Sequence, residues 1–316
     1  MEPILTILVP IYNHERYLLN ALYSIEQQEI SYPYEVIIGE DASTDNSRDV
    51  LEEFQKSAPD NYFFVYRDKN TGMLENISDL FYRARGKYVI ILEGDDYWIY
   101  NDKINEQVAF LEKNNQFSGV AHSVKMIDET GSLLNMKYMP EKGDGIYKIE
   151  DFLQGKLPGQ TASFMYRNFF SAMKIFQYMG ENKNYALDRF IAFVVATKGN
   201  IYCTSQKWSA YRYVTQGGSS YSANTDFSSE EFAQSALEFH RTLYNYTLRE
   251  KCNKRCVKVS EKLFYKSYFR DEIINNKKNV FKLLISVLQS AKFPISTMVW
   301  IGWQLLYRIL CGKISR

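Results

Sequence analysis

The stretch Lys87-Tyr-Val-Ile-Ile-Leu-Glu-Gly-Asp-Asp96 joins an apolar run to a cluster of acids. Residues 87–92 are mainly aliphatic or aromatic, which is typical of a strand buried on both faces. Three carboxylates follow within residues 93–96, and such a cluster repels itself unless a cation neutralises it. Carboxylate oxygens are the ligands that Mg²⁺ and Mn²⁺ prefer. The stretch therefore predicts a metal site at the end of a strand, with a solvated turn as the alternative.

Similar strands precede this stretch, and helical segments separate them. The expected strands are residues 4–9, 34–39 and 62–66, and the expected helices are residues 14–29, 47–54 and 76–85. Strands that alternate with helices at this spacing predict parallel βαβ units with right-handed crossovers. In such sheets, ligands bind at the carboxyl ends of the strands. The polar clusters that follow these strands should therefore meet along one edge.

The rest of the chain predicts fewer strands and then only helices. We expect a strand at residues 160–166, a helix at residues 185–197, a strand at residues 201–213 and a mobile, Gly- and Ser-rich loop at residues 217–226. Ser228-Ser-Glu-Glu231 has the capping-box pattern that opens a helix. We therefore expect an α/β domain at residues 1–220 and a helical region at residues 221–316.

The first two strands also end in polar residues. The first ends at Pro10-Ile-Tyr-Asn13, a turn that exposes backbone amides and an aromatic ring to a nucleobase, although Asn13 could instead cap the following helix. The second ends at Gly39-Glu-Asp-Ala-Ser-Thr-Asp45. Asp45 is expected to cap the next helix, because Asp is favoured at that position. Asp41 is expected instead to accept hydrogen bonds from a base or a ribose.

Four motifs around these strands resemble those of family 2 glycosyltransferases. They are Val9-Pro-Ile-Tyr-Asn13, Glu35-Val-Ile-Ile-Gly-Glu-Asp-Ala-Ser-Thr-Asp45, Ala84-Arg-Gly-Lys87 and Leu92-Glu-Gly-Asp-Asp96, in the order and spacing of that family. The resemblance covers about residues 4–112. It implies the GT-A fold, a Rossmann-like α/β fold with a mostly parallel mixed sheet flanked by helices, here with a helical C-terminal extension. It also implies that the protein uses a nucleotide-diphospho sugar.

The resemblance also implies roles for residues around this donor. The nucleoside pocket and the contact to the base, usually uracil, would be formed by Pro10, Tyr12, Asn13 and Asp41. The D-x-D element of the family falls on Glu93-Gly-Asp95. The carboxylates of Glu93 and Asp95 would bind the ribose and, through Mn²⁺ or Mg²⁺, the diphosphate. Because Glu replaces the first Asp here, we assign the metal to Asp95 and Asp96.

Two further residues match family features in the second half of the chain. Asp188, near the start of an expected helix, matches the acid on the acceptor side of the sugar. As general base it would take the acceptor hydroxyl proton during one direct displacement, which inverts the anomeric configuration; a capping aspartate is the alternative. Arg212, in Tyr211-Arg212, would neutralise the departing diphosphate. A surface arginine is the alternative, and the His that often follows this Arg in the family is absent.

The C-terminal region carries most of the positive charge. The net charge of the whole chain is +1, but residues 241–316 contain 16 Lys and Arg against 4 Asp and Glu, so the rest is acidic. Residues 277–292 and the segment after Pro294 place apolar side chains beside these cations. Such helices bind anionic lipid, so we expect residues 277–316 to contact a membrane surface. Packing on the catalytic body or a homodimer interface is the alternative, and the large apolar face argues against nucleic acid.

The functional prediction is an inverting glycosyltransferase of bacterial surface polysaccharide synthesis. It would use a UDP-sugar, Mn²⁺ or Mg²⁺ and a saccharide or lipid-linked saccharide acceptor. Four scattered cysteines and an N-terminus without a basic leader favour a cytoplasmic protein, peripheral at the inner face of the cell membrane. One alternative is a nucleotidyltransferase, which would normally carry a Gly-rich basic loop after the first strand. The other is a catalytically silent relative that scaffolds a membrane complex, although the acids are all present.

Overall fold

The computed structural model divides the chain into two compact units. It describes residues 2–138, 141–170, 178–179, 187–214, 230–274 and 280–310. The sheet unit comprises Met1–Asp151, Gly155–Phe176 and Leu187–Thr225, and the helical unit comprises Phe152–Gln154, Gln177–Ala186 and Asp226–Arg316. The boundary expected at residue 220, the loop at 217–226 and the start of the capping box at 228–231 lie outside the described residues.

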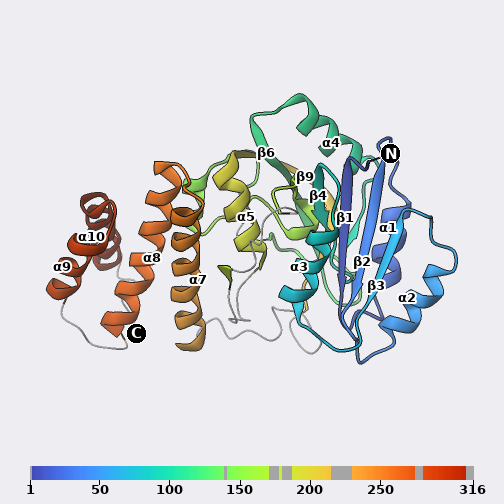
Figure 1. Ribbon diagram of the computed structural model, residues 1–316, viewed down its shortest axis with the longest axis horizontal. Helices are drawn as coiled ribbons and strands as arrows, with labels where there is room; N and C mark the ends of the chain where they lie inside the picture. Colours follow the sequence, from blue (N-terminus) through green and yellow to red (C-terminus); the bar gives the residue numbers. More distant parts are fainter. Residues whose placement is uncertain are drawn as a thin grey trace. The chain divides into compact units, whose positions relative to one another are not determined.

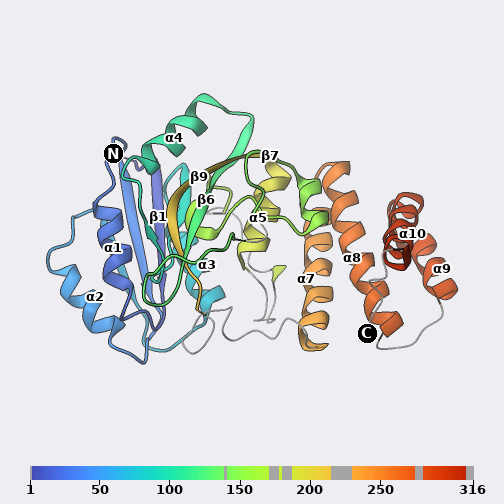
Figure 2. The same cartoon turned by 180° about the vertical axis from the view of Figure 1, so that it is seen from behind.

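Parallel strands form the centre of the sheet unit (Figure 1). They are β1 (Leu5–Ile11), β2 (Tyr34–Glu40), β3 (Tyr62–Tyr66) and β4 (Tyr88–Ile91), in the order β3-β2-β1-β4. The connecting helices are α1 (Leu18–Glu26), α2 (Ser47–Gln55) and α3 (Met73–Arg83). Helices α1 and α2 cover one face of these strands and α3 covers the other (Figures 1 and 2). The predicted βαβ units are confirmed.

The remaining strands make the sheet mixed. They are β5 (Tyr97–Trp98), β6 (Phe117–Ile127), β7 (Gly145–Tyr147), β8 (Met165–Arg167) and β9 (Asn200–Arg212). Strand β8 runs antiparallel between β4 and β6, while β6 and β9 are parallel. Helix α4 (Lys103–Lys113) precedes β6, the short helix η1 (Ile149–Gln154) follows β7, and α5 (Leu187–Lys198) precedes β9. The expected helix at residues 185–197 and the expected strand at residues 201–213 are therefore confirmed.

The strand expected at residues 160–166 is only partly correct. Residues Thr161–Ser163 form a 3₁₀ turn, η2, and the strand begins at Met165. The Gln160 side-chain oxygen accepts a hydrogen bond from the Ala162 amide at 2.7 Å, and the Ser163 hydroxyl donates to the Gln160 carbonyl at 2.7 Å. These local bonds compete with the strand ladder for the same backbone groups and favour a tight turn.

The apolar patterns of the sequence explain why this framework is rigid. Strands β1 and β4 are buried along their whole length, as expected for parallel strands covered on both faces. Helix α1 buries one stripe, which consists of Leu18, Ala21, Leu22 and Ile25. Each large aliphatic side chain removed from water in this way contributes about 1.5–3 kcal/mol. The loops that follow β1, β2 and β4 are therefore carried by the most deeply packed part of the sheet unit.

The helical unit has its own small core. Its helices are α7 (Glu230–Arg249), α8 (Lys254–Ile274), α9 (Val280–Ser290) and α10 (Pro294–Leu310). The core consists of Tyr265, Phe269, Leu283, Val287 and Ile301, from three of these helices. The helical C-terminal extension is thus confirmed. Within the described residues, no helix is both long enough and apolar enough to cross a membrane.

Candidate active site

The loops after β1 and β2 are tied together by side chains. Asn13 adopts a left-handed backbone conformation with φ 58°, and its amide donates to the Ser43 hydroxyl at 3.0 Å. The Asn13 side-chain oxygen accepts from the Thr44 amide at 2.8 Å. Asn13 therefore binds the neighbouring loop. The alternative, in which Asn13 caps α1, is wrong, because the N-cap residue of that helix is Tyr17. A left-handed non-glycine residue costs about 1–3 kcal/mol and persists only where its surroundings hold it, as these bonds do.

Asp45 acts at the start of α2. One carboxylate oxygen accepts from the Ser47 amide at 2.9 Å, and the other accepts from the Glu15 amide at 3.1 Å. The first of these bonds satisfies an amide that the helix itself leaves without a partner. The expectation that Asp45 caps the helix is only partly correct, because the N-cap residue of α2 is Asn46 and Asp45 acts from one residue earlier. The second oxygen of Asp45 adds a further link between the two loops.

Asp41 is buried and its carboxylate is held by a third loop. One oxygen accepts from the Thr71 amide at 2.9 Å and the Thr71 hydroxyl at 2.7 Å, and the other accepts from the Gly72 amide at 2.8 Å. Arg67 lies 3.7 Å from the first oxygen. In this structure Asp41 fixes the Thr71–Gly72 turn beside the ends of β1 and β2. Its contact with a base stays a prediction.

Two side chains hold the acidic loop after β4. One carboxylate oxygen of Asp96 accepts from the Arg212 backbone amide at 2.9 Å, and the other accepts from the Gln160 side-chain nitrogen at 2.7 Å. The same Gln160 nitrogen lies 3.3 Å from a carboxylate oxygen of Glu93. Asp96 is only 1% exposed. Asp96 is thus engaged with the protein through both oxygens, and its predicted contact with a metal stays a prediction.

Arg212 supports the same loop from β9. Its Nε donates to the Asp95 carbonyl at 3.1 Å, and its Nη1 donates to the Asp128 carbonyl at 2.8 Å. The guanidinium lies over the Tyr17 ring, 4.0 Å from its centre, and the residue is 3% exposed. The alternative of a surface arginine is therefore wrong. The predicted contact with a diphosphate stays a prediction, and the observed partners are the acidic loop and its surroundings.

The carboxylates of this site lie close enough to affect one another. Burial, followed by the charges of Asp95 and Asp188, raises the pKa of Glu93 to about 8. Burial and the charges of Asp95 and Glu93 also raise the pKa of Asp96. Asp188, in the first turn of α5, has a pKa raised by burial and partly lowered again by Arg189. The fold thus brings Asp188 to the acidic loop although the two lie far apart in the sequence.

The acids fit a divalent cation by their chemistry. Hard carboxylate oxygens suit Mg²⁺ and Mn²⁺. After burial, the charges of Asp95 and Asp188 also raise the pKa of Glu93, and a cation relieves this kind of repulsion. Within the described part of the chain, no group of three or more His, Cys, Asp or Glu residues is arranged so that it could bind a metal ion together. Mg²⁺ commonly binds through one or two carboxylates together with substrate phosphates, so a preformed cluster of three is not required.

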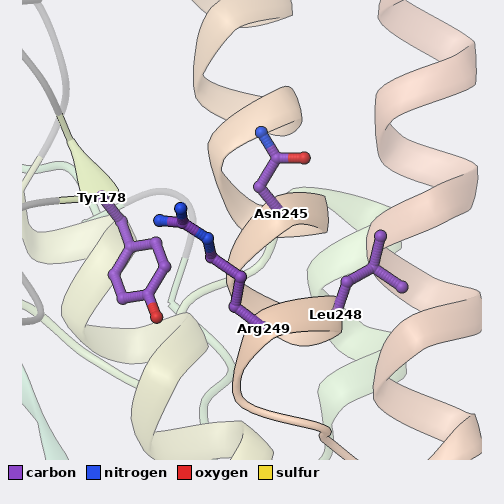
Figure 3. Close-up of a pocket in the computed structure, with 4 residues that line it drawn as sticks. All are labelled: Tyr178, Asn245, Leu248 and Arg249. Carbon is purple, nitrogen blue, oxygen red and sulfur yellow. The ribbon is translucent and has the colours of Figure 1, made fainter.

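The described helical unit contains a pocket without any of these residues. Its volume is about 430 Å³, and it is lined by Tyr178, Asn245, Leu248 and Arg249. Figure 3 shows the Arg249 side chain reaching toward the Tyr178 ring, with the guanidinium 5.6 Å from the ring centre. The Tyr178 hydroxyl donates to Glu250. None of the residues predicted for the site lines this pocket.

The comparison with protein families agrees with the motifs. The model of the family described as glycosyl transferase family 2 matches residues 6–176, which is more than half of the chain. The chain belongs to family 2 of the glycosyltransferases. Its α/β fold is the GT-A fold, and the enzyme class expected from the sequence is confirmed. A nucleotidyltransferase does not fit this membership.

Curated relatives match only part of this glycosyltransferase. It is 36% identical over 121 residues to the uncharacterized protein Rv1520 of Mycobacterium tuberculosis, covering 38% of the chain and 35% of the relative. It is 33% identical over 131 residues to the putative teichuronic acid biosynthesis glycosyltransferase TuaG of Bacillus subtilis, covering 41% of the chain and 50% of the relative. The chain thus spans at most half the length of these two relatives.

A solved structure resembles the fold over more of the chain. The crystal structure of S. aureus TarS 1-349 in complex with UDP-GlcNAc aligns with a TM-score of 0.60 and 15% identity, covering 88% of this chain and 74% of the TarS 1-349 chain. At this identity the likeness concerns the fold alone. It extends beyond residue 176, where the family match ends.

Several residues around this site could not be recognised from the sequence. Gln160 links Asp96 to Glu93, Tyr17 stacks on Arg212, and Thr71 binds Asp41. Each reaches the site from an element that is distant in the sequence. No local pattern marked them, because glutamine, tyrosine and threonine are common residues whose partners depend on the assembled sheet.

Proposed function

We propose that the protein is an inverting glycosyltransferase that transfers a sugar from a UDP-sugar to a hydroxyl of a saccharide or lipid-linked saccharide. The observation that carries the proposal is the buried acidic loop after β4, where the Gln160 side-chain nitrogen donates to the carboxylates of both Glu93 and Asp96. Burial, followed by the charges of Asp95 and Asp188, raises the pKa of Glu93 in this loop to about 8. Such perturbed groups at the carboxyl ends of parallel strands are typical of active sites.

Asp188 is proposed as the general base. Burial raises its pKa, which increases its affinity for a proton. The acceptor hydroxyl would give its proton to Asp188 while its oxygen forms the bond to the anomeric carbon. The bond from that carbon to the diphosphate oxygen breaks, and its electron pair leaves with UDP. A single displacement from the face opposite the diphosphate inverts the configuration.

We assign the metal contact to Asp95 and the contact with the ribose to the nearby Glu93. Both oxygens of Asp96 already accept protein hydrogen bonds, so we now give Asp96 the role of positioning the loop. A bound Mn²⁺ or Mg²⁺ would supply positive charge that stabilises the diphosphate leaving group. Arg212 would add to this by holding the Asp95 carbonyl in place.

The nucleoside is proposed to lie against the loop of Pro10, Tyr12 and Asn13. The bonds from Asn13 to the loop after β2 hold this turn in a left-handed conformation. The choice of uridine is supported by the complexes of TarS with UDP-GlcNAc and with UDP. Asp41 would contribute to nucleoside binding either by contacting the base directly or by holding the Thr71–Gly72 turn in place.

Calorimetric titration tests this proposal. UDP, GDP and CDP are titrated in the presence of Mn²⁺ and in the presence of EDTA, into the wild-type protein, Asp95→Asn and the control Asp60→Asn, which changes an exposed residue. We expect Mn²⁺-dependent UDP binding that Asp95→Asn loses and Asp60→Asn keeps. Binding of no nucleotide under any condition would instead favour the silent scaffold.

The acceptor and location are proposed from the helical unit and a relative. The name of TuaG, a putative teichuronic acid biosynthesis glycosyltransferase, supports a role in surface polysaccharide synthesis. Lys254, Lys258, Lys262 and Lys266 repeat every four residues along α8, so they form one basic stripe. Helix α10 exposes a stripe of Ile295, Val299 and Trp303. We propose that these stripes hold the protein peripherally at the anionic inner face of the cell membrane, where a lipid-linked acceptor would be presented.

A further inference from the structure

Two tyrosine rings beside the acidic cluster have no role in the mechanism above. Tyr211 is the penultimate residue of β9, and Tyr138 lies in the segment that follows β6. Their ring centres are 5.5 Å apart, and the ring planes meet at 77°. This is the edge-to-face arrangement that aromatic pairs prefer. Both side chains are half-buried, so the pair is not part of the hydrophobic core.

The backbone after β6 brings Tyr138 to this position. The Asp128 carboxylate accepts from the amides of Thr130 and Ser132, both at 2.9 Å, and the Leu134 amide donates to the Met126 carbonyl at 2.9 Å. The segment therefore turns back along its own strand. Met126 is itself paired with Tyr211 across the ladder between β6 and β9.

Tyr211 and Arg212 connect the pair to the acidic loop. Successive residues of a strand point to opposite faces, so Arg212 reaches the Asp95 carbonyl from one side of β9 while Tyr211 faces Tyr138 on the other. Burial raises the pKa of both tyrosines, and the next contributions are the charge of Asp188 for Tyr138 and that of Asp96 for Tyr211. The rings are therefore within the field of the proposed base.

We propose that the Tyr138–Tyr211 pair is a wall of the acceptor subsite and binds the pyranose ring that is to be glycosylated. The flat face of an aromatic ring packs on the C–H groups of a pyranose, whose hydroxyls remain free for polar partners. Asp188 supplies such a partner for the reacting hydroxyl. The proposal rests on the proposed function, since it uses Asp188 as the base, and it gives a role to two tyrosines that have none in the mechanism above.

Saturation-transfer NMR tests the subsite directly. The protein is loaded with UDP and Mg²⁺, which is diamagnetic, and mixed with methyl pyranosides of glucose, galactose, mannose and N-acetylglucosamine. Wild type, Tyr138→Phe, Tyr138→Leu and Tyr138→Ala are compared with the control Tyr82→Ala, which removes a tyrosine that is 80% exposed on α3. Titration of UDP into each variant is measured in parallel, so that loss of the donor site is recognised separately.

The expected result is transfer of saturation to the ring protons of at least one pyranoside in wild type, Tyr138→Phe and Tyr82→Ala. Tyr138→Leu keeps apolar volume without a flat ring, so it should lose the signal together with Tyr138→Ala while UDP still binds. A signal that survives in Tyr138→Leu and Tyr138→Ala would overturn the proposal, as would the absence of any signal in a wild-type protein that binds UDP. Failure of UDP binding in wild type would instead refute the proposed function on which it rests.

Discussion

Asp188 is the residue whose loss should stop the chemistry and leave the donor site intact. Asp188→Asn keeps the shape of the side chain but removes the carboxylate that accepts the proton. We expect the turnover number to fall by about 10²–10⁴-fold. UDP affinity should stay the same or rise, because a negative charge that acts on Glu93 is removed. Steady-state kinetics with the UDP-sugar found in a donor panel, together with calorimetry, measure both quantities. An unchanged turnover number would assign the base to another residue.

His122 makes the stability of the sheet unit sensitive to acid. Burial and then the neighbouring Lys103 hold the pKa of His122 well below its usual value of about 6.5. The ring is neutral and its Nδ1 donates to the Ser123 carbonyl at 2.8 Å. Below about pH 6.5, His122 binds a proton in the unfolded chain but stays neutral in the folded chain. The contribution of neutral, buried His122 to the free energy of unfolding is therefore present above that pH and is lost as the pH falls.

The role of His122 is tested by comparing the acid sensitivity of the wild-type protein with that of a His122 variant. Urea unfolding of wild type and His122→Asn is followed at pH 7.5 and at pH 5.5. Other groups titrate in both proteins, so the difference between them isolates His122. Wild type should lose about 1 kcal/mol more stability than the variant on acidification, because each pH unit below the unfolded pKa costs up to about 1.4 kcal/mol. An equal loss in both proteins would show that His122 accepts a proton in the folded state.

At the scale of elements, one buried acid organises the helical unit. Glu261 of α8 is 0% exposed. Its carboxylate accepts from the Lys292 amide at 2.6 Å, the Phe293 amide at 3.0 Å, the Thr297 hydroxyl at 2.6 Å and the Tyr244 hydroxyl at 2.9 Å. These bonds satisfy amides at the start of α10 and place a negative charge at its positive end. They also join α7 to α8 and α8 to α10.

Replacing Glu261 by Gln should therefore destabilise the helical unit. Each oxygen of the Glu261 carboxylate accepts at least two hydrogen bonds. In the variant, the side-chain NH₂ group would replace one of these oxygens and would face N–H and O–H donors without an acceptor. We expect a loss of about 2–3 kcal/mol in the free energy of unfolding. The matched control is Glu238→Gln, because Glu238 forms an exposed ion pair with Arg241 that contributes about 0–1 kcal/mol. Urea denaturation followed by circular dichroism compares the two, and equal effects would contradict the role of Glu261.

Elements with strong local patterns were predictable, and elements held by distant partners were not. The alternation of apolar strands and amphipathic helices up to Leu92 predicted β1 to β4 because local pattern and burial agree there. The segment around Gln160 reads as a strand, but its polar side chains prefer the turn η2. Strand β8, at Met165–Arg167, is short and antiparallel, and its position between β4 and β6 depends on the assembled sheet.

The same reason explains how far the site could be predicted. Asp95 and Asp188 were assigned from their motifs, and their roles in metal binding and proton transfer stay predictions. Arg212 was recognised, but its partners at the Asp95 carbonyl and Tyr17 could not be read from the sequence. The sequence also could not separate Asp95 from Asp96. The bonds of Asp96 to Gln160 and Arg212 are the reason why we propose Asp95 for the metal and Asp96 for positioning the loop.

At the scale of the whole molecule, charge and function divide along the chain. Residues 241–316 hold 16 basic against 4 acidic residues, although the net charge of the chain is +1. Lysines of α8 lie over two aromatic rings further along the chain. Lys258 lies over Phe293, which precedes α10, at 5.1 Å, and Lys262 and Lys266 lie over Trp300 of α10, at 6.0 and 5.8 Å. The helical unit thus carries held cations and, on α10, an exposed apolar stripe of Ile295, Val299 and Trp303, and this combination suits the anionic surface of a lipid bilayer.

Vesicle sedimentation tests this membrane contact. We expect the protein to bind vesicles that contain phosphatidylglycerol and not vesicles of phosphatidylcholine alone, and to dissociate at about 1 M salt, where the Debye length falls to about 3 Å. Each lysine near the surface contributes about 1 kcal/mol, so Lys262→Gln with Lys266→Gln should weaken binding by about 30-fold. The matched control is Lys56→Gln with Lys113→Gln, two exposed lysines of the sheet unit.

A Trp303 variant distinguishes membrane binding from a homodimer interface. Its side chain is 72% exposed on α10, so Trp303→Ser should leave the fold intact and remove an anchor at the headgroup boundary. If the membrane is the partner, Trp303→Ser weakens sedimentation with vesicles and leaves the molecular mass in solution unchanged. A wild-type protein that sediments as a dimer without lipid, and a Trp303→Ser variant that sediments as a monomer, would show that the stripe binds a second copy. The basic stripe on α8 would then need another explanation, because two copies of a surface with the same positive charge repel each other.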